Sequence, residues 1–190
     1  MPILGVIASS IAKGGFTPTG SYDALVSTSS TGSSTYTFSG IPTDGQYAHL
    51  QLRINFNVAS DSGAIKIRFN GDAGSNYASH SIFTESVSVR VRGQASQDNI
   101  RFGGVWGSTI TGNPGIYVID ILDYTSTTKA KTIRGYYGLD QSTGTNFGEV
   151  GFTSGLWTNT SSAINSITFF SESGVSTITG FNAALYGLRG

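Results

Sequence analysis

Few side chains in this 190-residue chain could carry out nucleophilic or acid–base chemistry. The sequence contains no cysteine, no Gly-x-Ser-x-Gly stretch and two histidines, His49 and His80, for which we expect structural roles. The nearest carboxylate pair is Asp120 and Asp123, but residues an odd number apart on a strand point to opposite faces. A glycosidase needs two carboxylates that face each other about 5 to 10 Å apart. The sequence therefore predicts no catalytic residue and no enzyme.

One stretch contains several oxygen-bearing side chains that could bind Ca²⁺. These are Asn70, Asp72, Ser75 and Asn76. The stretch lacks the EF-hand pattern and its residue types favour turns, so we predict a hydrogen-bonded turn. Two glycine pairs, Gly14-Gly15 and Gly103-Gly104, lack a following Lys-Ser/Thr, so they predict bends and not a phosphate site. No metal and no cofactor is expected.

The charge balance excludes two classes of partner. Eleven basic and eleven acidic side chains give a formal net charge of zero, so no long-range field attracts nucleic acid or an anionic membrane. Near neutrality also removes the repulsion between copies, which suits a protein that associates. Since there is no cysteine, stability must come from packing and strand pairing, without disulfides.

Apolar residues recur at every second position, which predicts strands that have one buried face. The clearest alternation covers His49 to Val58, and the same pattern predicts half-buried strands at Ile65 to Phe69 and Val87 to Val91. Further candidate strands are Thr35 to Ile41, Ile100 to Trp106, Ile116 to Tyr124, Thr132 to Leu139, Glu149 to Trp157, Ala163 to Phe170 and Phe181 to Leu188. Turn-forming residues separate them, so the fold class predicted is all-β, a jelly-roll-like antiparallel β-sandwich with a short N-terminal arm.

Three segments need separate interpretation. The Ser/Thr/Gly run from Ser27 to Ser34 is either a flexible link or, in the preferred interpretation, a long surface loop. The apolar run from Ile116 to Leu122 predicts a central strand covered on both sides, where a buried Asp120 would need a partner such as Arg134. Residues 1–26 form an N-terminal arm or an edge strand, and residues 27–190 form the sandwich.

The N-terminal segment and several aromatic residues are candidate interface residues. The apolar side chains of the segment are Ile3, Leu4, Val6, Ile7 and Ile11. They are too few to span a bilayer and lack a signal peptide's positive start, so the segment either docks on a neighbouring subunit or forms an edge strand.

Aromatic residues near glycine-rich turns could pack into an interface or stack on a sugar. They are Trp106, Tyr136, Tyr137, Phe147, Phe152 and Trp157. We expect Phe152 and Trp157 to fill the core. Tyr136 and Tyr137 point to opposite faces of a strand, so one of these two interface candidates is expected outside.

Four segments together carry a resemblance to a known group of proteins. They are IRFNGDAGSNYASH (67–80), YVIDILDYTSTTKAKTIRG (117–135), GLWTNTSSAINSITFF (155–170) and FNAALYGLRG (181–190). In this order, and with the start MPILGVIASSI, the chain resembles small virion structural proteins of tailed bacteriophages and prophages. Proteins of this kind serve as capsid decoration (cement) proteins or as parts of tail fibres and adaptors, commonly as trimers.

The resemblance implies a virion setting without any chemistry. We expect a capsid decoration protein on the capsid surface, a homotrimer that contacts the major capsid protein or other virion proteins. The absence of a fibrous repeat or long stalk favours this reading over a tail position. The alternative is a tail-fibre or adsorption protein that binds host-surface glycan through exposed aromatic rings and loop Asn, Asp and Arg residues.

Overall fold

The computed structural model describes residues 22–31, 33, 35–58, 63–85, 87–105, 115–140, 148–171 and 178–190. These residues form strands, turns and bends, and none of them is helical. The strands are β1 (Tyr22–Thr31), β2 (Thr35–Ser39), β3 (His49–Val58), β4 (Gly63–Phe69), β5 (Tyr77–Glu85), β6 (Ser88–Gln97), β7 (Ile100–Val105), β8 (Gly115–Leu122), β9 (Lys131–Asp140), β10 (Gly148–Trp157), β11 (Ser166–Ser171) and β12 (Ile178–Leu188). The predicted all-β class is confirmed.

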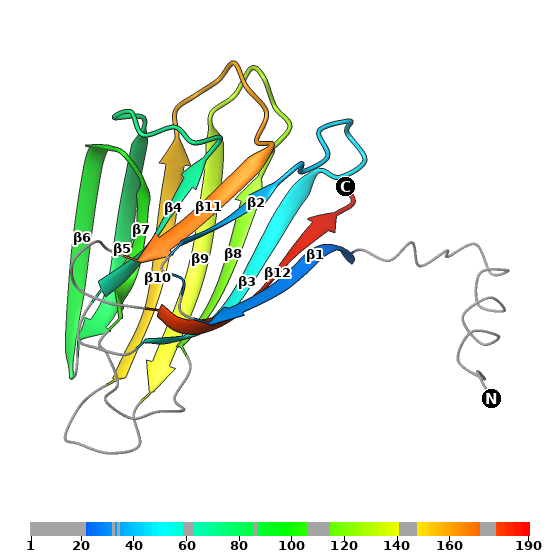
Figure 1. Ribbon diagram of the computed structural model, residues 1–190. Coiled ribbons are helices and arrows are strands. Elements are labelled where there is room, and N and C mark those ends of the chain that lie inside the picture. The colour runs from blue at the N-terminus through cyan, green and yellow to red at the C-terminus, as the bar shows by residue number, and fades with distance from the viewer. Residues whose placement is uncertain are drawn as a thin grey trace, which may run out of the picture.

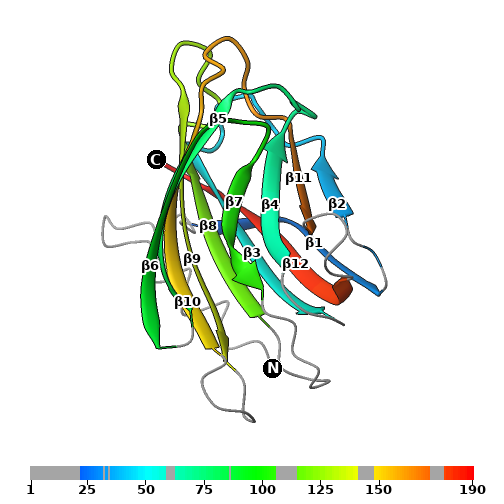
Figure 2. The same cartoon turned by 90° about the vertical axis from the view of Figure 1, so that its left-hand side faces the viewer.

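The strands form two antiparallel sheets that lie as two layers (Figures 1 and 2). The eight-stranded sheet has the order β1-β12-β3-β8-β9-β10-β5-β6, and the four-stranded sheet has the order β2-β11-β4-β7. From β1 to β4 the chain alternates between the two sheets, and it does so again from β11 to β12. The predicted antiparallel β-sandwich is therefore confirmed, with one sheet wider than the other.

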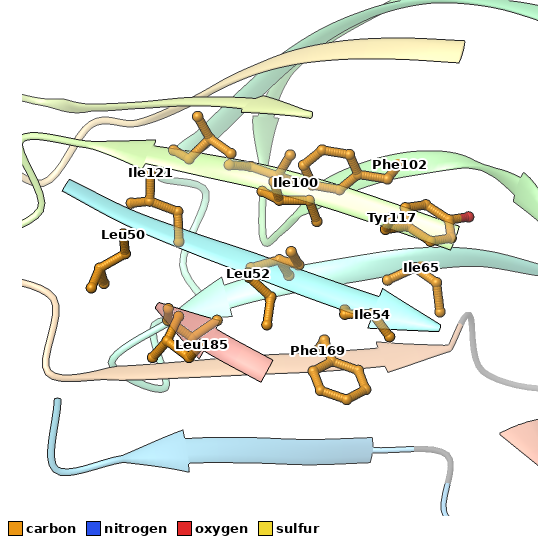
Figure 3. Packing of buried hydrophobic residues seen from close by; sticks show 14 of the residues in the cluster. Leu50, Leu52, Ile54, Ile65, Ile100, Phe102, Tyr117, Ile121, Phe169 and Leu185 are labelled. Atoms are coloured by element: carbon orange, nitrogen blue, oxygen red, sulfur yellow. The ribbon is translucent and has the colours of Figure 1, made fainter. Parts of the chain in front are cut away.

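The core lies between the sheets, where period-two alternation turns apolar side chains inward. On β3, whose bounds match the prediction, Leu50, Leu52 and Ile54 are buried while Arg53 is exposed. Figure 3 shows these side chains and those of β8 and β12 facing residues such as Phe169 on β11. An antiparallel sheet with one wet face explains this alternation.

Glycines on the inner face of β10 leave room for β7 to pack closely on the wide sheet. A Cβ on Gly155 would lie 2.8 Å from the Ile100 side chain, and one on Gly151 would lie 2.3 Å from the Tyr137 hydroxyl. From the other side, a Cβ on Gly103 would meet the Tyr137 ring at 2.3 Å, and its φ of +49° favours glycine. The Tyr137 ring therefore fills a slot between glycines of β7 and β10.

The stretch considered for Ca²⁺ forms the predicted turn. Asn70 and Gly71 have φ of 53° and 67°, and the Asp72 N–H donates to the Phe69 carbonyl at 2.9 Å. Asn and Gly are the residues that adopt this left-handed conformation most readily. The Asp72 carboxylate then accepts a 2.7 Å hydrogen bond from the indole N–H of Trp157. Trp157 is buried, as predicted.

A second buried polar contact fastens the loop that follows β10. Lys131 has 0% of its surface exposed, and its ammonium group donates to the carbonyl oxygens of Asn159, at 2.9 Å, and Ser162. The same nitrogen lies 5.1 Å from the centre of the Trp157 ring. Burial lowers the pKa of Lys131. The contacts compensate for removing the charge from water.

Two interpretations of the sequence are wrong. Most of the run from Ser27 to Ser34 belongs to β1, which pairs with β12 at the sheet edge, and is not a link or a surface loop. Ile116 to Leu122 is not covered on both sides, because its burial alternates and Ile116 is exposed. In both places pairing with neighbouring strands builds the strand although the core covers at most one of its faces. In addition, no strand was predicted at the position of β5.

Several predictions lie outside the described residues. They concern Ile3, Leu4, Val6, Ile7, Ile11, Gly14, Gly15, Trp106 and Phe147. The strand β1 begins at Tyr22, inside the range 1–26 that the sequence assigns to an arm or edge strand. At the other end of the chain, Arg189 forms a 2.7 Å ion pair with Asp23 of β1. The C-terminal residues are thus fastened to the first strand.

Candidate functional site

The outer face of the eight-stranded sheet, turned away from the four-stranded sheet, carries a row of exposed apolar side chains. Strand register places Val91 opposite Ile82, Ile82 opposite Phe152, and Phe152 opposite Tyr136. The exposed fractions of Phe152 and Tyr136 are 60% and 52%, and their ring centres lie 6.4 Å apart. We call these four residues the apolar row.

A row of polar side chains lies next to the apolar row on the same face. Register places His80 opposite Ser154, Ser154 opposite Arg134, and Arg134 opposite Asp120. Each member is two residues from a member of the apolar row or its continuation, so the rows are about 7 Å apart. With strands spaced about 4.8 Å apart, the polar row spans about 14 Å from β5 to β8.

The charged residues of this polar row are not paired with each other. Asp120 is half-buried and accepts a 2.8 Å hydrogen bond from the Gln51 amide, whose oxygen accepts one from Arg53 at 2.7 Å. The prediction that Asp120 is buried inside is therefore wrong. Its partner is an amide on the neighbouring strand β3, and not Arg134 or a hydroxyl of a neighbouring strand, which were the candidates. Among the described residues, the side chains of His80, Ser154 and Arg134 make no hydrogen bond or ion pair with one another or elsewhere.

The two rows line an open hollow of about 600 Å³. Its walls come from β5, β6, β8, β9 and β10, whose contributing residues are far apart in the sequence. Small-molecule sites have volumes of about 300 to 1,000 Å³ and combine apolar walls with a few polar groups. We refer to this feature as the outer-face hollow.

The predicted tyrosine pair divides as expected between the two faces of β9. Tyr136 is on the outer face, whereas Tyr137 is buried and donates a 2.8 Å hydrogen bond to the Glu149 carboxylate. Burial and that carboxylate raise the pKa of Tyr137. Of the two, Tyr136 is the one that can contact a partner. Phe152, which we expected in the core, is instead exposed because Gly151 and Thr153 occupy the inward positions around it.

The edge strand β6 has an arrangement that the sequence did not predict. Val89 and Val91, with Val87 just before the strand, are 67%, 79% and 81% exposed. The alternation at Val87 to Val91 was interpreted as a buried face, and this is wrong. Arg90 and Arg92 take the inward side, and the Arg92 guanidinium lies 5.0 Å from the centre of the Phe83 ring. Long arginine stems can cover apolar surface in this way.

The residues considered for catalysis are not brought together. His49 begins β3 and His80 is on β5, four strand positions away and thus about 19 Å apart. Asp120 is on the outer face, while Asp123 is in the turn after β8, where its N–H donates to the His49 ring at 3.1 Å. In the part of the chain that the structure describes, no three His, Asp or Glu side chains could hold a metal ion.

The described residues include no helix that could cross a membrane. In comparisons with known proteins, no family model, no curated protein and no solved structure matches the chain.

Proposed function

We propose that this chain is a structural protein of a bacteriophage particle, most specifically a capsid decoration protein that assembles as a homotrimer. One observation carries the association with another molecule: Val87, Val89 and Val91 form an exposed apolar edge on β6, which among the described strands pairs only with β5. We call these three valines the edge patch. Contiguous exposed apolar residues in a soluble domain mark a surface that another molecule covers.

The edge patch favours contact through side chains over extension of the sheet. Inward-pointing charged residues on an edge strand discourage the pairing of another strand, and Arg90 and Arg92 occupy those positions. A partner lying on the valine side meets no such barrier. Burying apolar surface there would contribute about 25 cal/mol per Å² before the entropic costs of association. A net charge of zero adds no repulsion between copies.

The virion setting rests on the sequence resemblance. The segments quoted above, which are spread from the N-terminus to the last residue, resemble virion proteins of tailed phages. The trimer, the contact with the major capsid protein and the capsid surface as location follow from that resemblance. A place in the tail is the alternative.

The same proposal includes the finer fold, a jelly roll. The strand order supports it: β1-β12-β3-β8 faces β2-β11-β4-β7, with successive strands of the chain shared between the two four-stranded groups. Two Greek keys folded together give this arrangement of eight strands. The strands β9, β10, β5 and β6 then extend one sheet beyond the other.

The test replaces Val87 and Val89 together by Lys. We expect the variant's self-association, measured by sedimentation of the full chain, to be tenfold or more weaker than that of the wild type. Its binding to particles from the host that encodes the chain, measured by co-sedimentation, should weaken by the same factor or more. Its melting temperature should stay near that of the wild type, because exposed substitutions change stability by about 0.5 kcal/mol or less.

The control is Val26→Lys, at the opposite edge of the sheet, where the valine is 38% exposed. This variant should associate normally. Unchanged association of the Val87/Val89 variant, or a wild-type chain that is monomeric and absent from particles, would contradict the proposal.

A further inference from the structure

We infer that the outer-face hollow binds a neutral saccharide. The hollow shares Val91 with the edge patch but differs from it in chemistry, because it joins two exposed aromatic rings to a row of polar side chains that have groups left to hydrogen-bond. The six residues that carry the inference are Tyr136, Phe152, His80, Ser154, Arg134 and Asp120. The inference goes beyond the proposed structural role and does not depend on it.

The rings offer the apolar part of such a site. Phe152 and Tyr136 are neighbours on β10 and β9, and their planes are tilted by 49°. An aromatic face carries a negative quadrupole, which attracts the weakly positive C–H groups on one face of a sugar ring. Because the two rings are tilted relative to each other, one flat partner surface cannot lie against both of them. Ile82 continues this apolar wall on β5.

The polar row offers the hydrogen bonds that a sugar's hydroxyl groups need. Arg134 supplies donors only, Ser154 supplies a donor and acceptors, and the imidazole of His80 supplies one of each when neutral. The carboxylate of Asp120 accepts, and the Gln51 amide already holds one of its oxygens at 2.8 Å. That contact fixes the carboxylate in place before a ligand arrives, which reduces the ordering cost of binding.

The charge pattern favours a neutral ligand over an anion. Arg134 and Asp120 are opposite each other in the register, so the row presents one cation and one anion at neighbouring positions. Arg92 also lines the hollow, but its guanidinium lies over the buried Phe83 ring, 5.0 Å from the ring centre. A phosphate or a nucleic-acid backbone would gain from Arg134 but would be repelled by Asp120. Sugar hydroxyls both donate and accept, so they can use both groups. The span of about 14 Å along the row suits a short oligosaccharide.

These polar groups are also unsuited to a purely apolar protein contact. Covering Arg134, Ser154 and His80 without hydrogen bonds would leave buried polar groups unsatisfied, which is unfavourable. A ligand rich in hydroxyl groups avoids that cost. The same face could therefore bind a saccharide while the edge patch contacts a protein.

The experiment measures binding of the full chain to a panel of neutral oligosaccharides built from glucose, galactose, mannose and N-acetylglucosamine. Saturation-transfer NMR at millimolar ligand identifies binders, and calorimetry gives their affinity. Oligosaccharides with uronic acids and inorganic phosphate form the anionic arm. We expect at least one neutral oligosaccharide to bind and the anionic probes to bind more weakly.

Two substitutions on the same strand and face locate the site. Phe152→Ala should weaken binding tenfold or more, whereas Val150→Ala, two residues away, exposed and outside the hollow, should change it less than twofold. Arg134→Gln should also weaken binding without lowering the melting temperature.

Failure of every neutral probe to bind would overturn the inference, as would equal affinities of the Phe152 and Val150 variants or tighter binding of the anionic arm. The Val87/Val89 lysine variant should bind the oligosaccharide as the wild type does. If the Val87/Val89 variant loses association and neither it nor the wild type binds a saccharide, the structural proposal is supported and the saccharide inference is wrong.

Discussion

Replacing Lys131 by Met should destabilise the fold although it removes a buried charge. The substitution keeps most of the apolar stem, so it leaves little cavity. It removes the donor to the carbonyl oxygens of Asn159 and Ser162 and the cation above the Trp157 ring. The loop that follows β10 is held by these contacts, so their loss acts on a defined segment.

The size of the effect follows from opposing terms. Hydrogen bonds from a charged donor contribute about 1.5 to 3 kcal/mol each, and the cation–π contact about 0.5 to 2 kcal/mol. Relief from burying the ammonium group offsets part of this loss, because burial disfavours the charged form, as the lowered pKa of Lys131 shows. We expect a net loss of about 2 to 4 kcal/mol in the free energy of unfolding. For a chain of this size, that corresponds to roughly 5 to 15 °C in melting temperature.

The assay is thermal and urea unfolding of the variant beside a matched control. Lys129→Met changes an exposed lysine two residues away, in the turn before β9, and should alter stability by about 0.5 kcal/mol or less. If the Lys131 variant is as stable as the Lys129 variant, the free-energy cost of burying the ammonium group equals or exceeds the free energy that its hydrogen bonds contribute. The reasoning above would then be refuted.

Two further predictions concern the interior and the acid range. Gly151→Ala should cost about 1 to 3 kcal/mol, because the new methyl would displace the Tyr137 ring, and calorimetry would show a lower melting temperature; an unchanged value would contradict the close packing. Burial alone would raise the pKa of Asp72, but hydrogen bonds from Trp157 and from the chain nearby lower it below 3.8 overall. The ionised Asp72 therefore contributes its full stabilisation at pH values above its pKa in the unfolded chain. This stabilisation is lost as the pH falls through the lower pKa of Asp72 in the folded chain. Asp72→Asn should thus flatten the melting-temperature profile between about pH 5 and pH 2. An identical acid slope in the variant would show that other carboxylates dominate.

The sequence predicted the strands whose faces differ in polarity. His49 to Val58 was recovered with its bounds, since Leu50 and its neighbours alternate with polar residues and one face is buried. It did not predict β1, because an edge strand held by backbone pairing can expose Ser and Thr along most of its length. Tyr, Val and Thr in β1 favour strands, but the Ser-rich stretch has no run of alternating apolar residues that would mark a buried face.

Alternation shows which residues share a face, but not which face meets the core. The valines at 87, 89 and 91 share a face as predicted, yet that face is outside because the wide sheet extends beyond the narrow one. The candidate site was even less accessible to sequence reasoning. His80, Arg134 and Ser154 become neighbours only through the pairing of β5, β9 and β10. The sequence predicted that one of Tyr136 and Tyr137 lies outside, and Tyr136 is the one that belongs to the site.

The pairing of β1 with β12, and of β2 with β11, has a consequence for how the chain is made. The strands β1 and β2 leave the ribosome before β11 and β12 and have no partner until these are synthesised, because β12 also separates β1 from β3. Contacts between distant parts of a sequence slow folding, and unpaired strands are prone to aggregation while they wait. β1 is rich in Ser and Thr and carries little apolar surface. This composition keeps the strand soluble during translation, while it has no partner.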